Sequence, residues 1–233
     1  MRPKRYAPVF LQPGASTSFP DPEPFDADGL VAIGGDLAPD RLLAAYARGI
    51  FPWFEEGYVP MWWSPDPRAV LAPDALHVSR SLARTLRRGG FSLTWNRCFP
   101  RVMRECGARR GGTWIVPEML RAYEALHRLG HAHSLEVWNA DDGELVGGVY
   151  GVQVGGLFAA ESKFHRRTDM SKVALVALVR SLFAAGLELL DVQFATPHLA
   201  ALGATELPRR EYLRRLAVAR EHEVDLRVLE PAL

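Results

Sequence analysis

Three polar side chains in the second half of the chain have types and spacings suited to acid–base and ester chemistry. Asp191 and Gln193 stand two residues apart in an otherwise apolar run, so strand alternation predicts that both point to one face. A buried carboxylate and a buried amide need hydrogen-bond partners. The two side chains could be structural groups that bind loop backbone, or they could be a reactive pair. Glu161, which ends a neighbouring predicted strand, favours the reactive pair, because the three groups would converge where the strands separate.

Apolar residues on the surrounding segments would form the walls of such a cleft. They are equally explained as ordinary core, since a pocket and a core can differ by one missing side chain. The candidates are Val149, Phe158, Leu175, Leu178, Leu182 and Leu190.

Residues 34–71 combine aromatic rings with prolines. Three of the six tryptophans, Trp53, Trp62 and Trp63, lie within eleven residues of one another, and prolines restrict the backbone around them. Large rings must be buried or meet a partner. The segment is therefore either a small core under a braced loop or a preformed pocket for a flat or apolar ligand.

Arginines gather on a predicted helix at residues 79–88. Spacings of four and three place Arg80, Arg84 and Arg87 on one face, with Arg88 beside them. A solvated helix face is the ordinary interpretation, and a surface that follows a nucleic-acid backbone is the functional one. No sequence-reading DNA module is visible, which favours RNA.

Metal and cofactor motifs are weak in this sequence. His131 and His133 form an H-x-H pair without a third ligand at a recognisable spacing, so we expect no metal site. Cys98 and Cys106 fit neither a zinc pattern nor a supported disulfide. There is no nucleophile elbow, P-loop or dinucleotide fingerprint.

The elements that must position these groups predict an α+β fold. After a short strand at 30–33 and a helix that begins at Pro39, we expect a boundary near Pro67. This gives a small N-terminal α+β domain (1–67) and a C-terminal domain (68–233). In the second domain we predict a strand at 91–95, a helix at 117–129, a hairpin formed by 132–138 and 145–153, a strand at 157–161, a helix at 171–184, a strand at 187–194 and a helix at 209–220.

Hairpin, strand, helix, strand is the central order of an acetyltransferase-like mixed sheet with flanking helices. Coenzyme A users place a glycine-bearing phosphate loop between the central strand and the helix. The corresponding residues 162–170 contain no glycine, which disfavours acetyl-CoA.

Composition fits one ordinary globular protein. The 233 residues are 48% hydrophobic and 24% charged, with a formal net charge of +1. The N-terminus has no apolar signal region, and no apolar run reaches transmembrane length, so we expect a cytoplasmic protein without a membrane segment.

Ten short motifs, in order along the chain, resemble the leucyl/phenylalanyl-tRNA–protein transferase family. The run WWSPDPR and the combination of GHAHS with EVW are the most specific of them. The motifs are GGDL at 34–37, GIFPWF at 49–54, WWSPDPR at 62–68, GTWI at 112–115, GHAHS at 130–134, EVW at 136–138, GG at 147–148, ES at 161–162, DVQ at 191–193 and PRR at 208–210.

The resemblance implies an enzyme that moves leucine or phenylalanine from aminoacyl-tRNA to the α-amino group of proteins with N-terminal arginine or lysine. That reaction marks them for the N-degron pathway, without a cofactor, and we expect a monomer. The alternatives are another acyltransferase on the same fold, such as one using aminoacyl-tRNA for a different amine, and a non-catalytic RNA-binding module.

The resemblance also implies roles for individual residues. Asp191 and Gln193 would form the reaction centre, Glu161 would face the cationic end of the acceptor, and Trp53 and Trp114 would stack on the terminal adenosine. The apolar wall would hold the aminoacyl side chain, and Arg80, Arg84, Arg87 and Arg88 would contact the acceptor stem. The chain departs from the family at Lys163, where methionine is common, which puts donor and acceptor preference in question.

Overall fold

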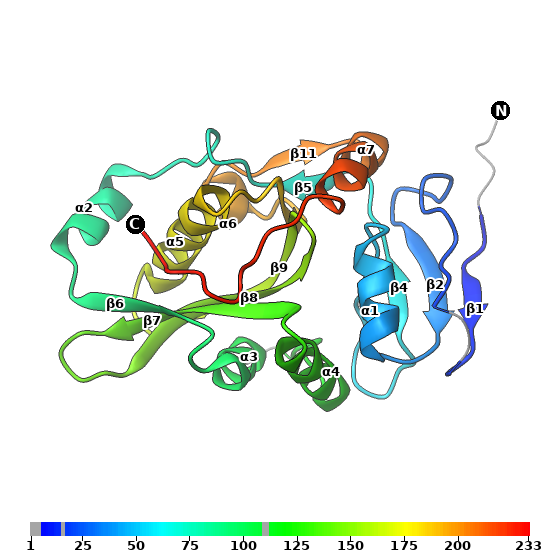
Figure 1. Cartoon of the computed structure of the whole chain (residues 1–233), viewed down its shortest axis with the longest axis horizontal. Helices are drawn as coiled ribbons and strands as arrows, with labels where there is room; N and C mark the ends of the chain where they lie inside the picture. Colours follow the sequence, from blue (N-terminus) through cyan, green and yellow to red (C-terminus); the bar gives the residue numbers. More distant parts are fainter. Residues whose placement is uncertain (1–5, 15–16, 109–111) are drawn as a thin grey trace.

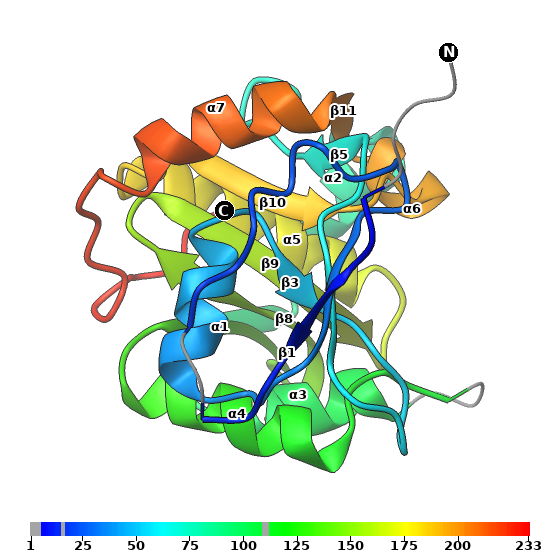
Figure 2. The same ribbon diagram turned by 90° about the vertical axis from the view of Figure 1, so that its right-hand side faces the viewer.

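The computed structural model describes residues 6–14, 17–108 and 112–233, and the strands in these ranges form two sheets (Figures 1 and 2). The first sheet has the order β1-β2-β4-β3. Its strands are β1 (Val9–Leu11), β2 (Leu30–Gly34), β3 (Phe51–Pro52) and β4 (Met61–Trp63), and helix α1 (Pro39–Tyr46) lies between β2 and β3 in the chain.

The second sheet begins at Arg68 and has the order β11-β5-β10-β9-β8-β7-β6. Its strands are β5 (Arg68–Val70), β6 (Phe91–Trp95), β7 (Ala132–Asn139), β8 (Leu145–Val154), β9 (Leu157–His165), β10 (Leu189–Gln193) and β11 (Thr205–Leu207). Among the described strand pairs of this sheet, only β9 and β10 are parallel. The helix between them crosses over the sheet, so both strands run in the same direction.

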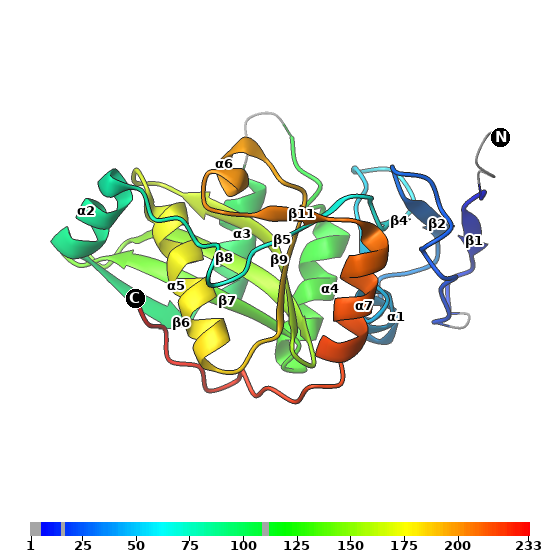
Figure 3. The same ribbon diagram turned by 90° about the horizontal axis from the view of Figure 1, so that it is seen from above.

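Within the described ranges, six helices flank the second sheet. They are α2 (Arg80–Arg88), α3 (Phe99–Gly107), α4 (Pro117–Arg128), α5 (Met170–Ala184), α6 (Pro197–Ala200) and α7 (Arg209–Ala219). Helix α5 covers one face and α3 and α4 cover the other (Figure 1). Figure 3 shows α2 at the end of the molecule away from the first sheet.

Local signals explain several helix boundaries. Pro39 and Pro117 begin α1 and α4, where the missing N–H costs nothing. Ser79 caps α2 by accepting a hydrogen bond from the Leu82 N–H. Gly49, with φ +72°, ends the α1 region where a Cβ would meet the Tyr212 ring of α7 at 2.7 Å.

The α+β class and the order hairpin, strand, helix, strand are confirmed. The prediction that the strand beginning at residue 157 ends at Glu161 was wrong, because β9 continues to His165 and pairs with β8 as far as Gly147. Helix α3 was also missed. The division into domains near residue 67 coincides with the change of sheet, and it remains a proposal.

The hydrophobic core connects the two sheets. Trp62 and Ile50 of the N-terminal segment belong to the same buried cluster as Phe99 and Met119 of α3 and α4. A second cluster fills the space between α5 and the large sheet. Among the described helices, none combines the length and apolar character needed to span a bilayer.

Candidate active site

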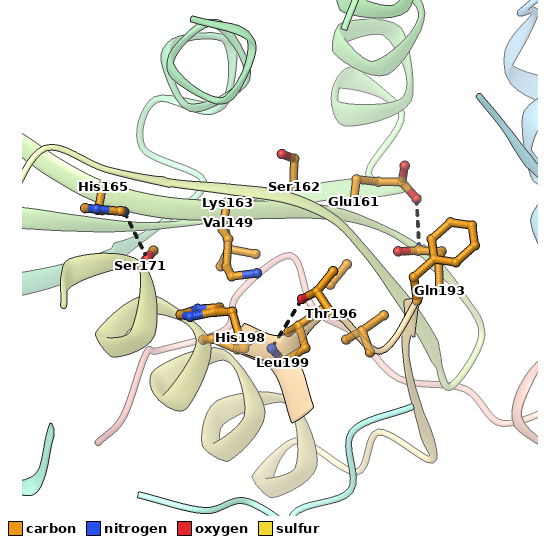
Figure 4. Close-up of a pocket in the computed structure, with 14 residues that line it drawn as sticks. Val149, Glu161, Ser162, Lys163, His165, Ser171, Gln193, Thr196, His198 and Leu199 are labelled. Carbon is orange, nitrogen blue, oxygen red and sulfur yellow. Dashed lines mark hydrogen bonds between the residues drawn. The ribbon is translucent and has the colours of Figure 1, made fainter. Parts of the chain in front are cut away.

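Two neighbouring cavities open where β9 and β10 separate. The parallel pairing of these strands ends at Ala159 and Asp191, as the separation predicted from sequence requires. The inner cavity, of about 390 Å³, is drawn in Figure 4. Its lining is Val149, Ala160, Glu161, Ser162, Lys163, His165, Ser171, Leu175, Val192, Gln193, Phe194, Thr196, His198 and Leu199.

The second cavity, which we call the aromatic cavity, has a volume of about 310 Å³. Its lining is Phe51, Pro52, Trp53, Trp114, Glu161, Gln193, Phe194 and Thr196. The two cavities therefore share Glu161, Gln193, Phe194 and Thr196. The structure brings Glu161 and Gln193 together at this junction, while their catalytic role remains a prediction.

Gln193 has an unusual backbone conformation at the end of β10. Its φ is +56°, a left-handed value that is uncommon outside glycine. The pairing of β10 with β5 also changes register between Asp191 and Gln193. Strained backbone of this kind persists only where the surrounding contacts hold it, and it often occurs at functional sites.

The Gln193 amide has two orientations, which differ in their partners. In one, Nε2 lies 3.5 Å from Glu161 Oε1. In the other, Nε2 donates to the carbonyl oxygens of Val192 at 3.2 Å and Ala160 at 3.0 Å, and Oε1 faces Glu161. The second orientation satisfies the amide better, and it requires Glu161 to donate a proton.

Glu161 is a carboxyl group suited to holding that proton. It is the extra residue of a β-bulge, since Tyr150 pairs with Ser162 but Gly151 pairs with Ala160. Burial raises its pKa to about 8, although hydrogen bonds from Tyr46 and Tyr123 act to lower it. At neutral pH the carboxyl group is therefore mostly protonated.

Tyr46 of α1 and Tyr123 of α4 hold this carboxyl group from the other face of the sheet. Their hydroxyl groups are hydrogen-bonded to each other, and both rings are fully buried or nearly so. Burial raises the pKa of both phenols, so they remain donors at every physiological pH. Glu161 thereby connects the N-terminal segment to the large sheet.

Asp191 has surroundings different from those of Gln193. Its side chain is fully buried and lines neither cavity. Arg68 donates to both carboxylate oxygens, at 2.9 and 2.6 Å, and Tyr212 donates to Oδ2 at 2.8 Å. The Gln193 N–H donates to Oδ1 at 2.9 Å. Simple alternation was therefore a poor guide, because the strand becomes irregular between the two residues.

Only part of the predicted apolar wall lines the inner cavity. Val149 and Leu175 do, whereas Phe158, Leu178, Leu182 and Leu190 belong to the core under α5 and are at most 1% exposed. The cavity lies over the first turns of α5, at Ser171 and Leu175, so residues one and two turns further along the helix fall beyond it.

Trp53 and Trp114 both line the aromatic cavity, as a stacking site for a ring would require. Trp53 is 44% exposed, and its ring lies 6.0 Å from Trp63 and 5.8 Å from Phe194. Trp62 is fully buried and donates to the Gly34 carbonyl at 2.9 Å. The aromatic-proline segment thus serves both as core and as a cavity wall.

The α2 arginines do not line the inner cavity. Arg80, Arg84, Arg87 and Arg88 are all exposed, and no ion pair joins them to an acidic residue within the described ranges. Thr85 on the same helix lies 3.5 Å from Asp169, the residue that precedes α5. Helix α2 therefore packs near the start of α5, the helix whose first turn contributes Ser171 to the cavity lining.

His133 of the H-x-H pair has ordinary structural contacts. His133 is buried, lies 2.9 Å from Asn96 Nδ2 and 3.2 Å from Gln153 Oε1, and stacks on Trp95. No cluster of three metal-binding side chains occurs among the residues that the structure describes. Neither Cys98 nor Cys106 forms a disulfide bond in the described part of the chain.

Sequence reasoning missed four residues that hold the site. Arg68 and Tyr212 fix Asp191, while Tyr46 and Tyr123 contact Glu161. Arg68 stood inside the recognised WWSPDPR run, and an arginine opening an apolar strand was a signal that it needs a buried anion. The tyrosines carry no such signal, since buried tyrosines are common.

The arrangement suits an enzyme that transfers a group between two bound molecules, since two cavities meet at a titratable carboxyl group and an amide. The model of the leucyl/phenylalanyl-tRNA protein transferase family matches residues 70–217, and the model of its N-terminal domain matches residues 35–66. The chain belongs to this family.

Several curated relatives carry the name leucyl/phenylalanyl-tRNA–protein transferase. The relative from Anaeromyxobacter sp. (strain Fw109-5) is 55% identical over 206 residues, 87% of each chain. The one from Magnetococcus marinus is 50% identical over 217 residues, 91% of this chain and 92% of that one. Among solved structures, FemX is 12% identical with a TM-score of 0.45, covering 72% of this chain and 66% of that one.

Proposed function

We propose that this protein transfers leucine or phenylalanine from an aminoacyl-tRNA to the N-terminal amine of an acceptor protein. The observation that carries the proposal is the position of Glu161 and Gln193 at the junction of the two cavities. The names of relatives at 50–55% identity support the same reaction.

The terminal adenosine would occupy the aromatic cavity and stack on Trp53 and Trp114. The aminoacyl side chain would enter the inner cavity beside Val149 and Leu175. The ester carbonyl then lies between them, at Glu161 and Gln193. Since aminoacyl esters are already activated, holding the two reactants in place supplies much of the acceleration.

In the transfer, the acceptor nitrogen forms a bond to the carbonyl carbon and the ester C–O bond breaks. The amine loses a proton, and the departing ribose oxygen gains one. An α-amine has a reference pKa of about 7.7–8.0, so a useful fraction is unprotonated at neutral pH. Glu161, with a pKa of about 8, is matched to exchange a proton in this range.

Asp191 would act as a positioning residue in this scheme. Its carboxylate is fully used by Arg68, Tyr212 and the Gln193 N–H, so it supports the left-handed backbone of Gln193 instead of touching substrate. This revises the direct role that the resemblance suggests.

The finer assignments belong to the same proposal. The acceptors would begin with arginine or lysine, and a cationic side chain near Glu161 would favour the ionised carboxylate. The α2 arginines would contact the acceptor stem. We further propose a monomeric cytoplasmic enzyme of the N-degron pathway.

The test is transfer of radiolabelled leucine from leucyl-tRNA to a peptide that begins with arginine. The expected result is labelled peptide, and Gln193→Ala should reduce the rate by at least tenfold while tRNA binding persists. Label on another amine only would indicate a different acyltransferase, and tRNA binding without any transfer would indicate an RNA-binding module. Either of these outcomes rejects the proposal.

A further inference from the structure

The inner cavity has a basic end, which an apolar aminoacyl pocket does not need. Lys163, His165 and His198 contribute to its lining, together with the apolar groups Val149, Leu175 and Leu199. Figure 4 shows Lys163 extending from β9 toward the side where His198 of α6 lies. The cavity therefore offers an apolar wall next to positively charged and polar groups.

The β-bulge at Glu161 is the reason that Lys163 faces this cavity. Before the bulge, Phe158 belongs to the core on the α5 side. After the bulge, Lys163 pairs with Val149, which also belongs to that core. Ser162 points away to the opposite side of the sheet (Figure 4). If Glu161 had kept its place in a regular alternation, Ser162 would have faced α5 and Lys163 would have faced away from it.

His198 lines this cavity and carries a buried ring nitrogen. Its Nε2 is inaccessible to solvent and has no hydrogen-bond partner among the described residues, although the side chain lines the cavity. Burial lowers the pKa of His198, and the charge of Lys163 lowers it further. A neutral imidazole beside an ammonium group leaves the field at this end positive.

Other charged groups nearby leave that field in place. His165 is engaged with Ser171 at 3.3 Å, and Lys172 is paired with Asp169 at 2.8 Å. Among the described residues that line the inner cavity, one is acidic, Glu161. It lies at the junction with the aromatic cavity and not at the basic end. A ligand group that enters this end must accept hydrogen bonds or carry negative charge.

We propose that Lys163 and His198 extend the donor range to an aminoacyl group whose side chain ends in a carboxylate, with glutamate as the fitting case. The methylenes of such a side chain would contact Val149 and Leu175, and its carboxylate would reach Lys163 and, once the imidazole ring turns toward the cavity, His198. The transfer step is unchanged: the same ester bond breaks and the same amide bond forms. This inference rests on the proposed transferase function.

The test uses one RNA microhelix that ends in CCA, charged separately with leucine, methionine, glutamine or glutamate. A common RNA removes any effect of tRNA identity, and glutamine matches glutamate in shape without its charge. With an arginine-starting peptide as acceptor, we expect glutamate to be transferred faster than glutamine. In Lys163→Met, the ratio of glutamate to leucine transfer should fall at least tenfold.

Three variants make this assay specific. Lys163→Arg keeps the charge and should retain most glutamate transfer. His198→Phe removes the buried ring nitrogen and should lower the glutamate to leucine ratio without abolishing leucine transfer. Lys172→Met, which removes a neighbouring lysine that does not line the cavity, should leave the ratio unchanged.

Leucine transfer reports on folding and on the proposed function in every variant. Wild-type protein that transfers leucine but not glutamate would overturn this inference and leave the transferase function intact. Equal losses for all four donors in Lys163→Met, with weaker binding of uncharged microhelix, would assign Lys163 to an RNA phosphate. A change confined to acceptor choice would likewise reject a donor role.

Discussion

Arg68 and Asp191, 123 residues apart in the chain, form a buried bidentate ion pair between β5 and β10. Each side chain is 1% exposed, and the guanidinium also donates to the Gly49 carbonyl at 3.0 Å. Burial alone would lower the pKa of Arg68, but Asp191 and Tyr212 outweigh it and raise the pKa. The pair connects the end of the N-terminal segment to the strand that carries Gln193.

Removing one partner of this pair should be strongly destabilising. We expect Arg68→Ala to lower the free energy of unfolding by about 3–5 kcal/mol, because Asp191 would remain as a buried charge without its main partner. Urea denaturation measures the effect. Arg214→Ala, which breaks an exposed pair with Glu211 on α7, is the matched control and should change stability little. Similar losses in the two variants would contradict the special role of the buried pair.

Glu161 should make stability fall as pH rises. Its folded pKa of about 8 exceeds the ordinary value of 4.5 for a glutamate side chain, so the native state holds a proton that the unfolded state has lost. The stabilising contribution is complete below about pH 4.5 and is lost as pH approaches 8. Denaturation of wild type and Glu161→Gln across this window measures it. A difference between the two proteins that stays constant with pH would rule out the raised pKa.

Trp53 should contribute to binding of the terminal adenosine. Replacing it by alanine should cost about 1–3 kcal/mol in binding of a non-hydrolysable aminoacyl-adenosine, which is the usual range for one stacked base. Isothermal titration calorimetry provides the measurement. Phe10→Ala, which removes an aromatic ring that is more exposed than Trp53 from β1, outside the lining of the cavity, should have no effect. Unchanged affinity in Trp53→Ala would exclude the aromatic cavity as the adenosine site.

The α2 arginines should strengthen binding of a complete aminoacyl-tRNA but not of aminoacyl-adenosine, which has no RNA helix. For Arg84→Ala/Arg87→Ala we expect weaker tRNA binding and a salt-dependence slope smaller by about two, one for each lost phosphate contact. Filter binding at several salt concentrations gives the slope. Affinity for aminoacyl-adenosine should stay the same. Arg214→Ala/Arg215→Ala on α7 serves as a control of equal charge, and an equal change in slope there would point to a general charge effect.

Leu178 should matter for stability but not for donor choice. It is fully buried beyond the end of the cavity, so Leu178→Ala should lower the unfolding free energy by about 2–5 kcal/mol and leave the ratio of leucine to phenylalanine transfer unchanged. Leu175→Ala, one turn earlier and lining the cavity, should alter that ratio. If Leu178→Ala shifted the ratio as much as Leu175→Ala, the cavity would extend further along α5 than its lining indicates.

Local patterns were sufficient for much of the fold. Proline and serine signals located the beginnings of α1, α2 and α4, and the hairpin β7–β8 followed from alternation around a turn at residues 141–144. The neighbourhood of Glu161 and Gln193 also followed, because the two strands are parallel neighbours joined by one helix. Each of these features depends on residues close together in the chain or on one crossover connection.

The family, the α+β class and the identity of the polar groups at the cavity junction all followed from the amino-acid sequence. The direction in which those groups face depends on the folded structure. The bulge at Glu161 reverses the alternation of β9, and the left-handed Gln193 interrupts β10, so a single residue in each strand redirects the side chains that follow. Strand pairing fixes both irregularities, and Arg68, Tyr46 and Tyr123 reach the site from distant segments. Such contacts leave no periodic trace in the sequence, because they depend on which elements meet in space.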